Sequence, residues 1–152
     1  MKSMIRNSRI FAIGAMIVAV LVVVTSALAV QDAKENPHAP HMMKCAAACA
    51  ECQVQCDACF QHCASLVNDG KKEHFTCMNL CLGCADCCKL CATLCARQSA
   101  FCVPAAEFCA KCCDDCAVAC EKLSDDKQMA ACAKSCRNCA KECRDMAKMM
   151  MK

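Results

Sequence analysis

Cysteine recurs in this sequence at a spacing that places it along one face of a helix. Within each of four segments, successive cysteines are separated alternately by four and three residues. These steps average 3.5 residues, which keeps every member on one face and matches the core positions of packed helices. The cysteines in the four segments are Cys45, Cys49, Cys52, Cys56, Cys59 and Cys63; Cys77, Cys81, Cys84, Cys88, Cys91 and Cys95; Cys109, Cys113, Cys116 and Cys120; and Cys132, Cys136, Cys139 and Cys143. The pattern predicts four helices whose core faces are lined with thiols.

Helix-breaking and capping residues fall between these segments. Gly70 suits a left-handed helix end, Pro104 suits a first helical turn, and Ser124 suits an N-cap. The predicted helices cover about residues 42–67, 72–98, 104–123 and 125–149. Because short connections join antiparallel neighbours, we predict an all-α fold, an antiparallel up-down-up-down four-helix bundle with a Cys-lined core, over residues 42–152. Phe75, Phe101 and Phe108 are expected to be packing residues.

The N-terminus has the layout of an export signal. Three basic residues precede an apolar run over residues 10–24, and small residues follow up to Ala29. We therefore predict a signal peptide at residues 1–29 and a flexible leader at 30–41. An uncleaved N-terminal anchor is the alternative, since the apolar run is long enough to span a membrane. Either way the protein is expected to be extracytoplasmic, in the periplasm.

The charge balance gives no sign of a nucleic-acid partner. Without residues 1–29 the chain keeps 15 of its 18 basic residues and all 15 acidic ones, so its net charge is zero. No basic patch therefore argues for binding to nucleic acid. The chain also lacks a nucleophile–base pair or phosphate-binding loop, so we do not expect an enzyme.

Packing alone does not explain so many core cysteines. Compared with Leu, each lost methylene forfeits about 0.8 kcal/mol of burial, and the voids left by small side chains add a further cost. A disulfide scaffold is a second interpretation, because an exported chain meets oxidising conditions. Disulfides need Cα atoms about 4.4–6.8 Å apart, whereas packed helix axes lie about 8–10 Å apart. A few facing pairs could close but a full lining could not, which favours metal ions on the axis.

The thiol pattern favours Cu(I) among the soft metals. Zinc prefers four ligands in a closed tetrahedral site, so the 23 cysteines would hold only about five or six ions without sharing. Iron–sulfur loops of typical spacing are absent. Cu(I) accepts two sulfurs, and each sulfur can bridge two ions, so we expect roughly one Cu(I) per cysteine. A zinc or mixed-metal thiolate buffer, or a disulfide-rich secreted structural or redox protein, remains as an alternative.

This pattern of four thiol-lined helices resembles the bacterial copper storage protein family, and the resemblance covers about residues 42–150. It implies non-enzymatic storage and sequestration of multiple Cu(I) ions that enter through an open end of the bundle. The implied ligands are the cysteines of the 3/4 pattern in the four segments, called the stripe cysteines below. It also implies a possible homo-oligomer. Expected partners are copper donor or acceptor proteins or small copper chelators. The leader departs from the folded-export signal of some exported members, because Arg6 and Arg9 are not adjacent.

Three cysteines lie outside the 3/4 pattern. Cys87 and Cys112 each precede a stripe cysteine by one residue, and we interpret them as possible ligands at the wall of the core. Cys102 lies one heptad before Cys109 in the turn before Pro104. It is interpreted either as a ligand at the end of the core or as an exposed thiol.

Methionines continue the stripes at one end of the predicted bundle. Extending the first stripe backwards reaches Met42, and extending the fourth forwards reaches Met146 and Met150. Thioethers and imidazoles suit Cu(I), so this end, with His38 and His41, is predicted to be the copper entrance. The alternative is that Met fills an irregular bundle end and that the two His are solvated. At the opposite end, His74 and Met129 continue the stripes and could close the core.

Overall fold

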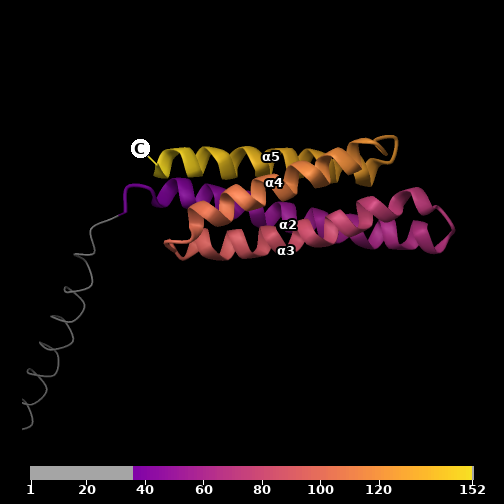
Figure 1. Cartoon of the computed structure of the whole chain (residues 1–152), viewed down its shortest axis with the longest axis horizontal. Helices are drawn as coiled ribbons and strands as arrows, with labels where there is room; N and C mark the ends of the chain where they lie inside the picture. The colour runs from indigo at the N-terminus through magenta and orange to yellow at the C-terminus, as the bar shows by residue number, and fades with distance from the viewer. Residues whose placement is uncertain (1–35, 152) are drawn as a thin grey trace, which may run out of the picture. The chain divides into compact units, whose positions relative to one another are not determined.

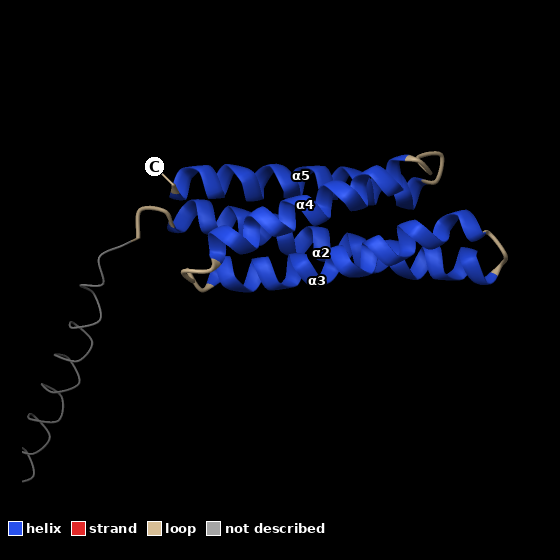
Figure 2. Ribbon diagram, viewed as in Figure 1, coloured by secondary structure: helices blue, strands red, loops and turns tan. Residues whose placement is uncertain are grey.

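Four helices make up the described part of the chain, residues 36–151, in this computed structural model (Figures 1 and 2). The helices are α2 (Ala39–Asn68), α3 (Phe75–Ala96), α4 (Cys102–Glu121) and α5 (Lys127–Met150), with a 3-10 turn η1 (Lys72–His74) before α3. No strand occurs between residues 36 and 151. The predicted signal peptide and leader residues 30–35 lie outside the described residues, so both stay predictions.

The helices run up and down around a common axis. Helix α2 packs against α3 and α5, and α4 packs against the same two helices, so α2 and α4 lie diagonally across the bundle. The start of α2, the α3–α4 connection and the end of α5 lie at one end, on the left of Figure 1. The other two connections lie at the opposite end. The predicted all-α up-down-up-down bundle is therefore confirmed.

Helix α2 begins earlier than the sequence predicts. It starts at Ala39 with Pro40 in its first turn, where the missing N–H of proline has no helical partner to lose. Residues 39–41, which we assigned to a flexible leader, are therefore helical. At the other end of α2, Gly70 takes a φ of 88°, as expected for a residue that ends a helix.

Helix α5 is capped by a different residue from the one predicted. The prediction of Ser124 as N-cap is wrong, because residues 122–125 form a turn. The extended backbone that a cap requires occurs at Asp126, where ψ is 123°. Asp126 Oδ1 accepts hydrogen bonds from the backbone N–H of Gln128 at 2.8 Å and of Met129 at 3.3 Å. His62 Nε2 in α2 lies 2.7 Å from the other carboxylate oxygen, which ties the cap to a second helix.

All twenty stripe cysteines are buried, with at most 1% of any of them exposed. Alanines such as Ala106, Ala117 and Ala140 flank the stripes, and their small side chains let the helices approach closely. The three phenylalanines expected to pack are instead 54% to 69% exposed. Phe108, for example, precedes Cys109 by one residue, and a step of one residue turns a side chain about 100° around the helix. The prediction that they pack inside is therefore wrong.

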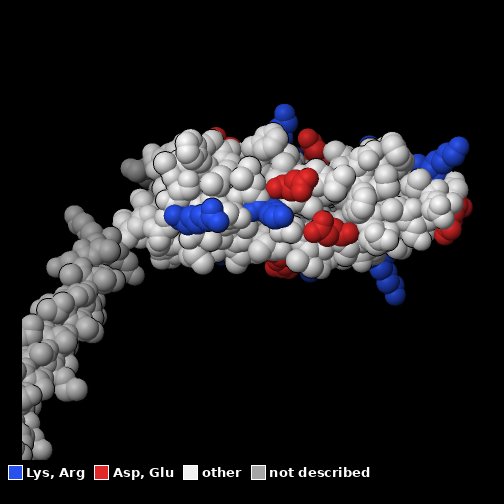
Figure 3. Space-filling view, turned by 90° about the horizontal axis from the view of Figure 1, so that it is seen from below, with Lys and Arg blue, Asp and Glu red and all other residues white. Residues whose placement is uncertain are grey.

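Apart from Glu142, the charged side chains of the described residues lie on the outside of the bundle. Arg137 on α5 forms ion pairs with Asp114 at 3.0 Å and Glu121 at 2.8 Å on α4. On the face in Figure 3, basic and acidic residues are interspersed. By length and composition alone, Lys72–Ala96 would be apolar enough to span a membrane. Its cysteines are buried where it packs against α2 and α4, which accounts for that composition in a core helix.

We expect Asp126→Ala to lower the free energy of unfolding by about 1 kcal/mol at neutral pH, because it removes the α5 cap. The hydrogen bond with His62 lowers the pKa of Asp126. This contribution should therefore be full above the ordinary Asp pKa of about 3.9 and be lost as pH falls through the lowered value. Urea unfolding at several pH values measures both effects.

Two control variants separate the causes. Asp126→Asn keeps a capping oxygen and should retain most of the stability, while Asp125→Ala changes an exposed neighbour and should have little effect. Equal losses in Asp126→Ala and Asp125→Ala would contradict the assignment of the cap.

Candidate metal centre

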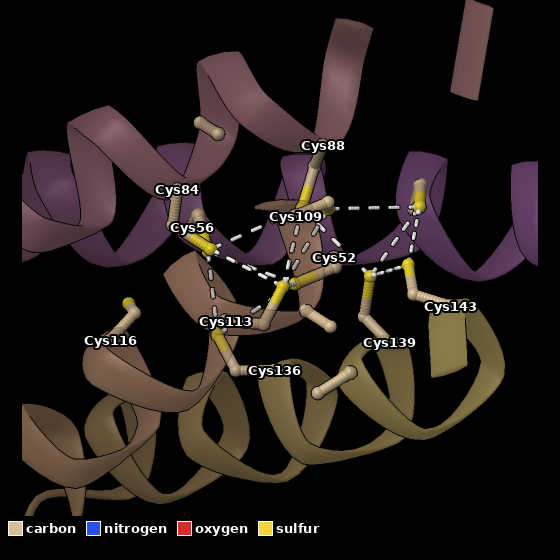
Figure 4. Close-up of a cluster of buried hydrophobic side chains, with 14 of the residues drawn as sticks. Cys52, Cys56, Cys84, Cys88, Cys109, Cys113, Cys116, Cys136, Cys139 and Cys143 are labelled. Carbon is tan, nitrogen blue, oxygen red and sulfur yellow. Dashed lines mark hydrogen bonds between the residues drawn. The ribbon is translucent and has the colours of Figure 1, made fainter. Parts of the chain in front are cut away.

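The core sulfurs converge on the bundle axis from all four helices (Figure 4). Neighbouring helices bring Sγ atoms together, as for Cys45 and Cys143 at 3.6 Å and Cys77 and Cys120 at 3.0 Å. Within one helix, pairs four residues apart such as Cys52 and Cys56 lie 3.9 Å apart. The helical periodicity thus sets the spacing along the axis, and helix packing sets the spacing across it.

Sulfurs also meet across the diagonals of the bundle. Cys49 on α2 lies 4.0 Å from Cys109 on α4, and Cys88 on α3 lies 3.9 Å from Cys139 on α5. Such contacts need the side chains of opposite helices to reach the axis. The lining is therefore a continuous column of sulfur and not a set of separate facing pairs.

Groups of four cysteines lie close enough to share a metal ion. In each group the sulfurs are all within 4.8 Å of one another. Five such groups are Cys45, Cys49, Cys91 and Cys143; Cys49, Cys109, Cys139 and Cys143; Cys52, Cys56, Cys84 and Cys136; Cys52, Cys84, Cys88 and Cys113; and Cys56, Cys116, Cys132 and Cys136. The groups overlap, since Cys49 and Cys52 each belong to two of them. Overlap suits ions joined by bridging thiolates better than isolated tetrahedral sites, each of which needs its own four ligands.

Hydrogen bonds between thiols make ionisation of the core uneven. The bond with Cys113 holds the pKa of Cys52 and of Cys109 well below the ordinary value for a thiol. The same interactions, with Cys109 foremost, raise the pKa of Cys113 far above that value. A thiolate is stabilised while its neighbours remain protonated donors, so the column cannot ionise fully without cations. Each bound Cu⁺ offsets one negative charge, and its binding releases protons.

The methionine end has the arrangement that the stripes predict. Met42 and Met146 are each 2% exposed, and Met150 is partly buried against the core. Met43, one residue off the stripe, is 51% exposed. At this end Cys45 and Cys95 lie 3.9 Å apart. Two thioether side chains thus lie buried just beyond the outermost thiols.

A pocket of about 370 Å³ opens at the methionine end. It is lined by His41, Lys44, Glu142, Asp145, Met146, Lys148 and Met149. Glu142 is 9% exposed and forms an ion pair with Lys44 at 2.9 Å. Sequence reasoning singled out Met146 and His41 but missed the charged residues. In the sequence, these charged residues look like ordinary surface residues of a helix, so no motif or spacing identified them as part of a pocket.

At the opposite end, Met129 closes the sulfur column. Its Sδ lies 3.4 Å from Cys59 Sγ, 3.7 Å from Cys63 Sγ and 3.6 Å from Cys77 Sγ, and the residue is fully buried. His74 is 7% exposed, and its Nδ1 is buried without a hydrogen-bond partner. We expected both residues to close this end of the core, and the contacts of Met129 with three thiols support this for Met129.

The three additional cysteines fall into two kinds. Cys102 is the first residue of α4 and only 1% exposed, so the interpretation of an exposed thiol is wrong. Cys87 and Cys112 are partly exposed and lie 3.2 Å apart. Burial raises the pKa of Cys102 and of Cys87, and raises that of Cys112 to about 12.

Comparison with known proteins connects this geometry to a family. A sequence model of the copper storage protein family matches residues 38–148. The apo form of copper storage protein 3 from Bacillus subtilis is 34% identical, with 68% of this chain and 95% of that chain covered and a TM-score of 0.60. The Cu(I)-bound copper storage protein BsCsp3 is 34% identical, with 70% and 98% covered and a TM-score of 0.65.

A protein from Nitrosospira multiformis is also similar, at 29% identity, with 72% of this chain and 97% of that chain covered and a TM-score of 0.63. No curated protein sequence matches the chain. The family match extends over most of the sequence and includes every cysteine of the sulfur column. The chain therefore belongs to the copper storage protein family.

Proposed function

We propose that the four-helix bundle stores many Cu(I) ions on its core thiolates, at roughly one ion per core cysteine. The observation that carries this proposal is the overlap of the four-cysteine groups along the axis. Because neighbouring groups share sulfurs, an ion bound in one group leaves bridging thiolates for the next. The Cu(I)-bound relative, similar over almost its whole length, supports the same cargo.

The burial of the ligands favours storage without catalysis. The stripe sulfurs belong to residues that are at most 1% exposed, so a substrate molecule cannot reach an ion bound among them. Thiolates from four helices also surround the axis on all sides. This lining keeps bound ions away from solvent. We therefore assign the protein a non-enzymatic role in copper homeostasis.

The methionine end is the entrance we propose for copper. Thioethers bind Cu(I) less strongly than thiolates, so Met42, Met146 and Met150 can take up an ion and pass it to Cys45 and Cys143. The pocket beside Met146 gives a copper carrier or small chelator space to approach. A copper donor or acceptor protein is the corresponding macromolecular partner.

For the location and assembly of the protein we propose export to the periplasm and a homo-oligomer. The predicted signal at residues 1–29 supports export to the periplasm, with contact to a membrane only if that segment is retained. The exposed Phe75, Phe101 and Phe108 offer apolar surface for a homo-oligomer.

Anaerobic titration of the reduced protein, residues 30–152, with Cu(I) should saturate near one ion per core cysteine. The absence of Trp and Tyr leaves the near-ultraviolet clear for thiolate-to-copper absorption, which measures the endpoint. Changing one whole group, Cys52, Cys84, Cys88 and Cys113, to Ser should lower the endpoint by about four ions. Saturation at only a few ions, with Zn²⁺ competing effectively, would argue instead for a zinc buffer.

The triple variant Met42→Leu, Met146→Leu and Met150→Leu should load Cu(I) several-fold more slowly, with an unchanged endpoint. Leu keeps the packing at this end but removes the thioethers. Stopped-flow absorption measures the rate, and Met78→Leu, a partly buried methionine away from this end, serves as the matched control. An unchanged rate in the triple variant would show that the methionines only fill space there.

A further inference from the structure

Two thiols outside the sulfur column face each other across the α3–α4 interface. Cys87 Sγ donates a hydrogen bond to Cys112 Sγ at 3.2 Å. Each residue directly precedes a stripe cysteine, and one residue turns the side chain about 100° away from the axis. Both are partly exposed, whereas the stripe cysteines are almost completely buried. The pair is therefore separate from the lining and open to solvent.

The pair has none of the shared contacts of the core. In the described part of the chain, Cys87 and Cys112 each have the other as their one sulfur partner within hydrogen-bonding distance. Cys88, by contrast, contacts Cys84, Cys109, Cys113 and Cys139. The pair therefore lies outside the network of shared sulfur contacts.

The separation of the two sulfurs is short enough for a disulfide bond to form after a small movement. Core pairs such as Cys77 and Cys120 are as close, at 3.0 Å, so it is partial exposure and not distance that sets Cys87 and Cys112 apart. A disulfide bond is about 2.05 Å long, so these sulfurs need to approach by only about 1 Å. Two thiols in this position can give up two electrons together.

We propose that Cys87 and Cys112 form a dithiol that reduces Cu(II) to the Cu(I) that the core stores. Each thiol loses a proton, and one electron passes to each of two Cu(II) ions. An S–S bond forms between Cys87 and Cys112, and two Cu(I) ions and two protons are released. This proposal depends on the proposed storage function in one respect only, namely that the core takes up the Cu(I) that the pair produces.

The surroundings of the pair suit Cu(II) better than those of the core. Cu(II) takes nitrogen and oxygen ligands, whereas all-sulfur sites select Cu(I). Asp86, whose side chain is exposed, directly precedes Cys87 on α3. An oxygen ligand is thus available on the surface of α3 next to the partly exposed pair, whereas the stripe thiols are buried.

The test uses protein whose core has first been filled with Cu(I) under anaerobic conditions. Copper(II) sulfate is then added, and the Cu(II) signal is followed by electron paramagnetic resonance. The wild type should consume two Cu(II) per chain, and non-reducing peptide mass analysis should find Cys87 linked to Cys112. The double variant Cys87→Ser, Cys112→Ser should consume none. The single variants, which keep one thiol, should form no intrachain link.

Thermal unfolding gives a second readout. The link would close a loop between residues 25 apart in the sequence, so oxidised wild type should melt roughly 10 °C above the reduced form. The double variant should show no such oxidant-dependent shift. If serine impairs folding, as judged by circular dichroism, Cys87→Ala, Cys112→Ala replaces it.

Two results would overturn the proposal. Equal consumption of Cu(II) by wild type and double variant would assign the reduction to other thiols. A Cu(I) endpoint higher by one ion in the wild type than in the double variant would make the pair a metal site instead. Failure of the storage function is distinguishable, because it would lower the Cu(I) endpoint of both proteins alike.

Discussion

Contacts between sulfur atoms along the bundle axis are the feature on which the rest of the structure depends. Thiols are small, so the helices approach closely enough for sulfurs of diagonal helices to meet, as Cys49 and Cys109 do at 4.0 Å. The same small size means that each core residue buries little apolar surface, so the metal-free bundle gains less from its core than an aliphatic bundle would. Cu(I) bound only by the folded state adds stability through linkage, which couples the cargo to the fold.

Methionine thioethers lie at both ends of this column, but their surroundings differ. At one end the buried thioethers of Met42 and Met146 lie at the proposed entrance for copper, where a pocket with charged walls opens beside Met146. At the other, Met129 lies within 3.4–3.7 Å of three thiols and is fully buried. Thioether sulfur thus serves near solvent at one end and completes the lining at the other.

A shift of one residue along a helix separates two kinds of cysteine chemistry. Cys88 and Cys113 join the shared column, while Cys87 and Cys112, one position earlier, meet outside it as an isolated pair. The column favours ions bridged by many sulfurs, and the isolated pair favours a two-electron change. In the proposed reactions, the column binds Cu(I) and the isolated pair reduces Cu(II).

Periodicity alone determined the four helices, the buried cysteine stripes and the inward positions of Met42 and Met146, because a 3/4 spacing fixes which face of a helix is apolar. The register between helices decided three other features: the contacts of Met129, the overlap of the cysteine groups and the contact between Cys87 and Cys112. The residue spacing within one helix does not determine that register. The capping of α5 by Asp126 in place of Ser124 depended on the path of the preceding turn. Sequence therefore determined which side chains face the axis, and only the tertiary packing decided which of them touch.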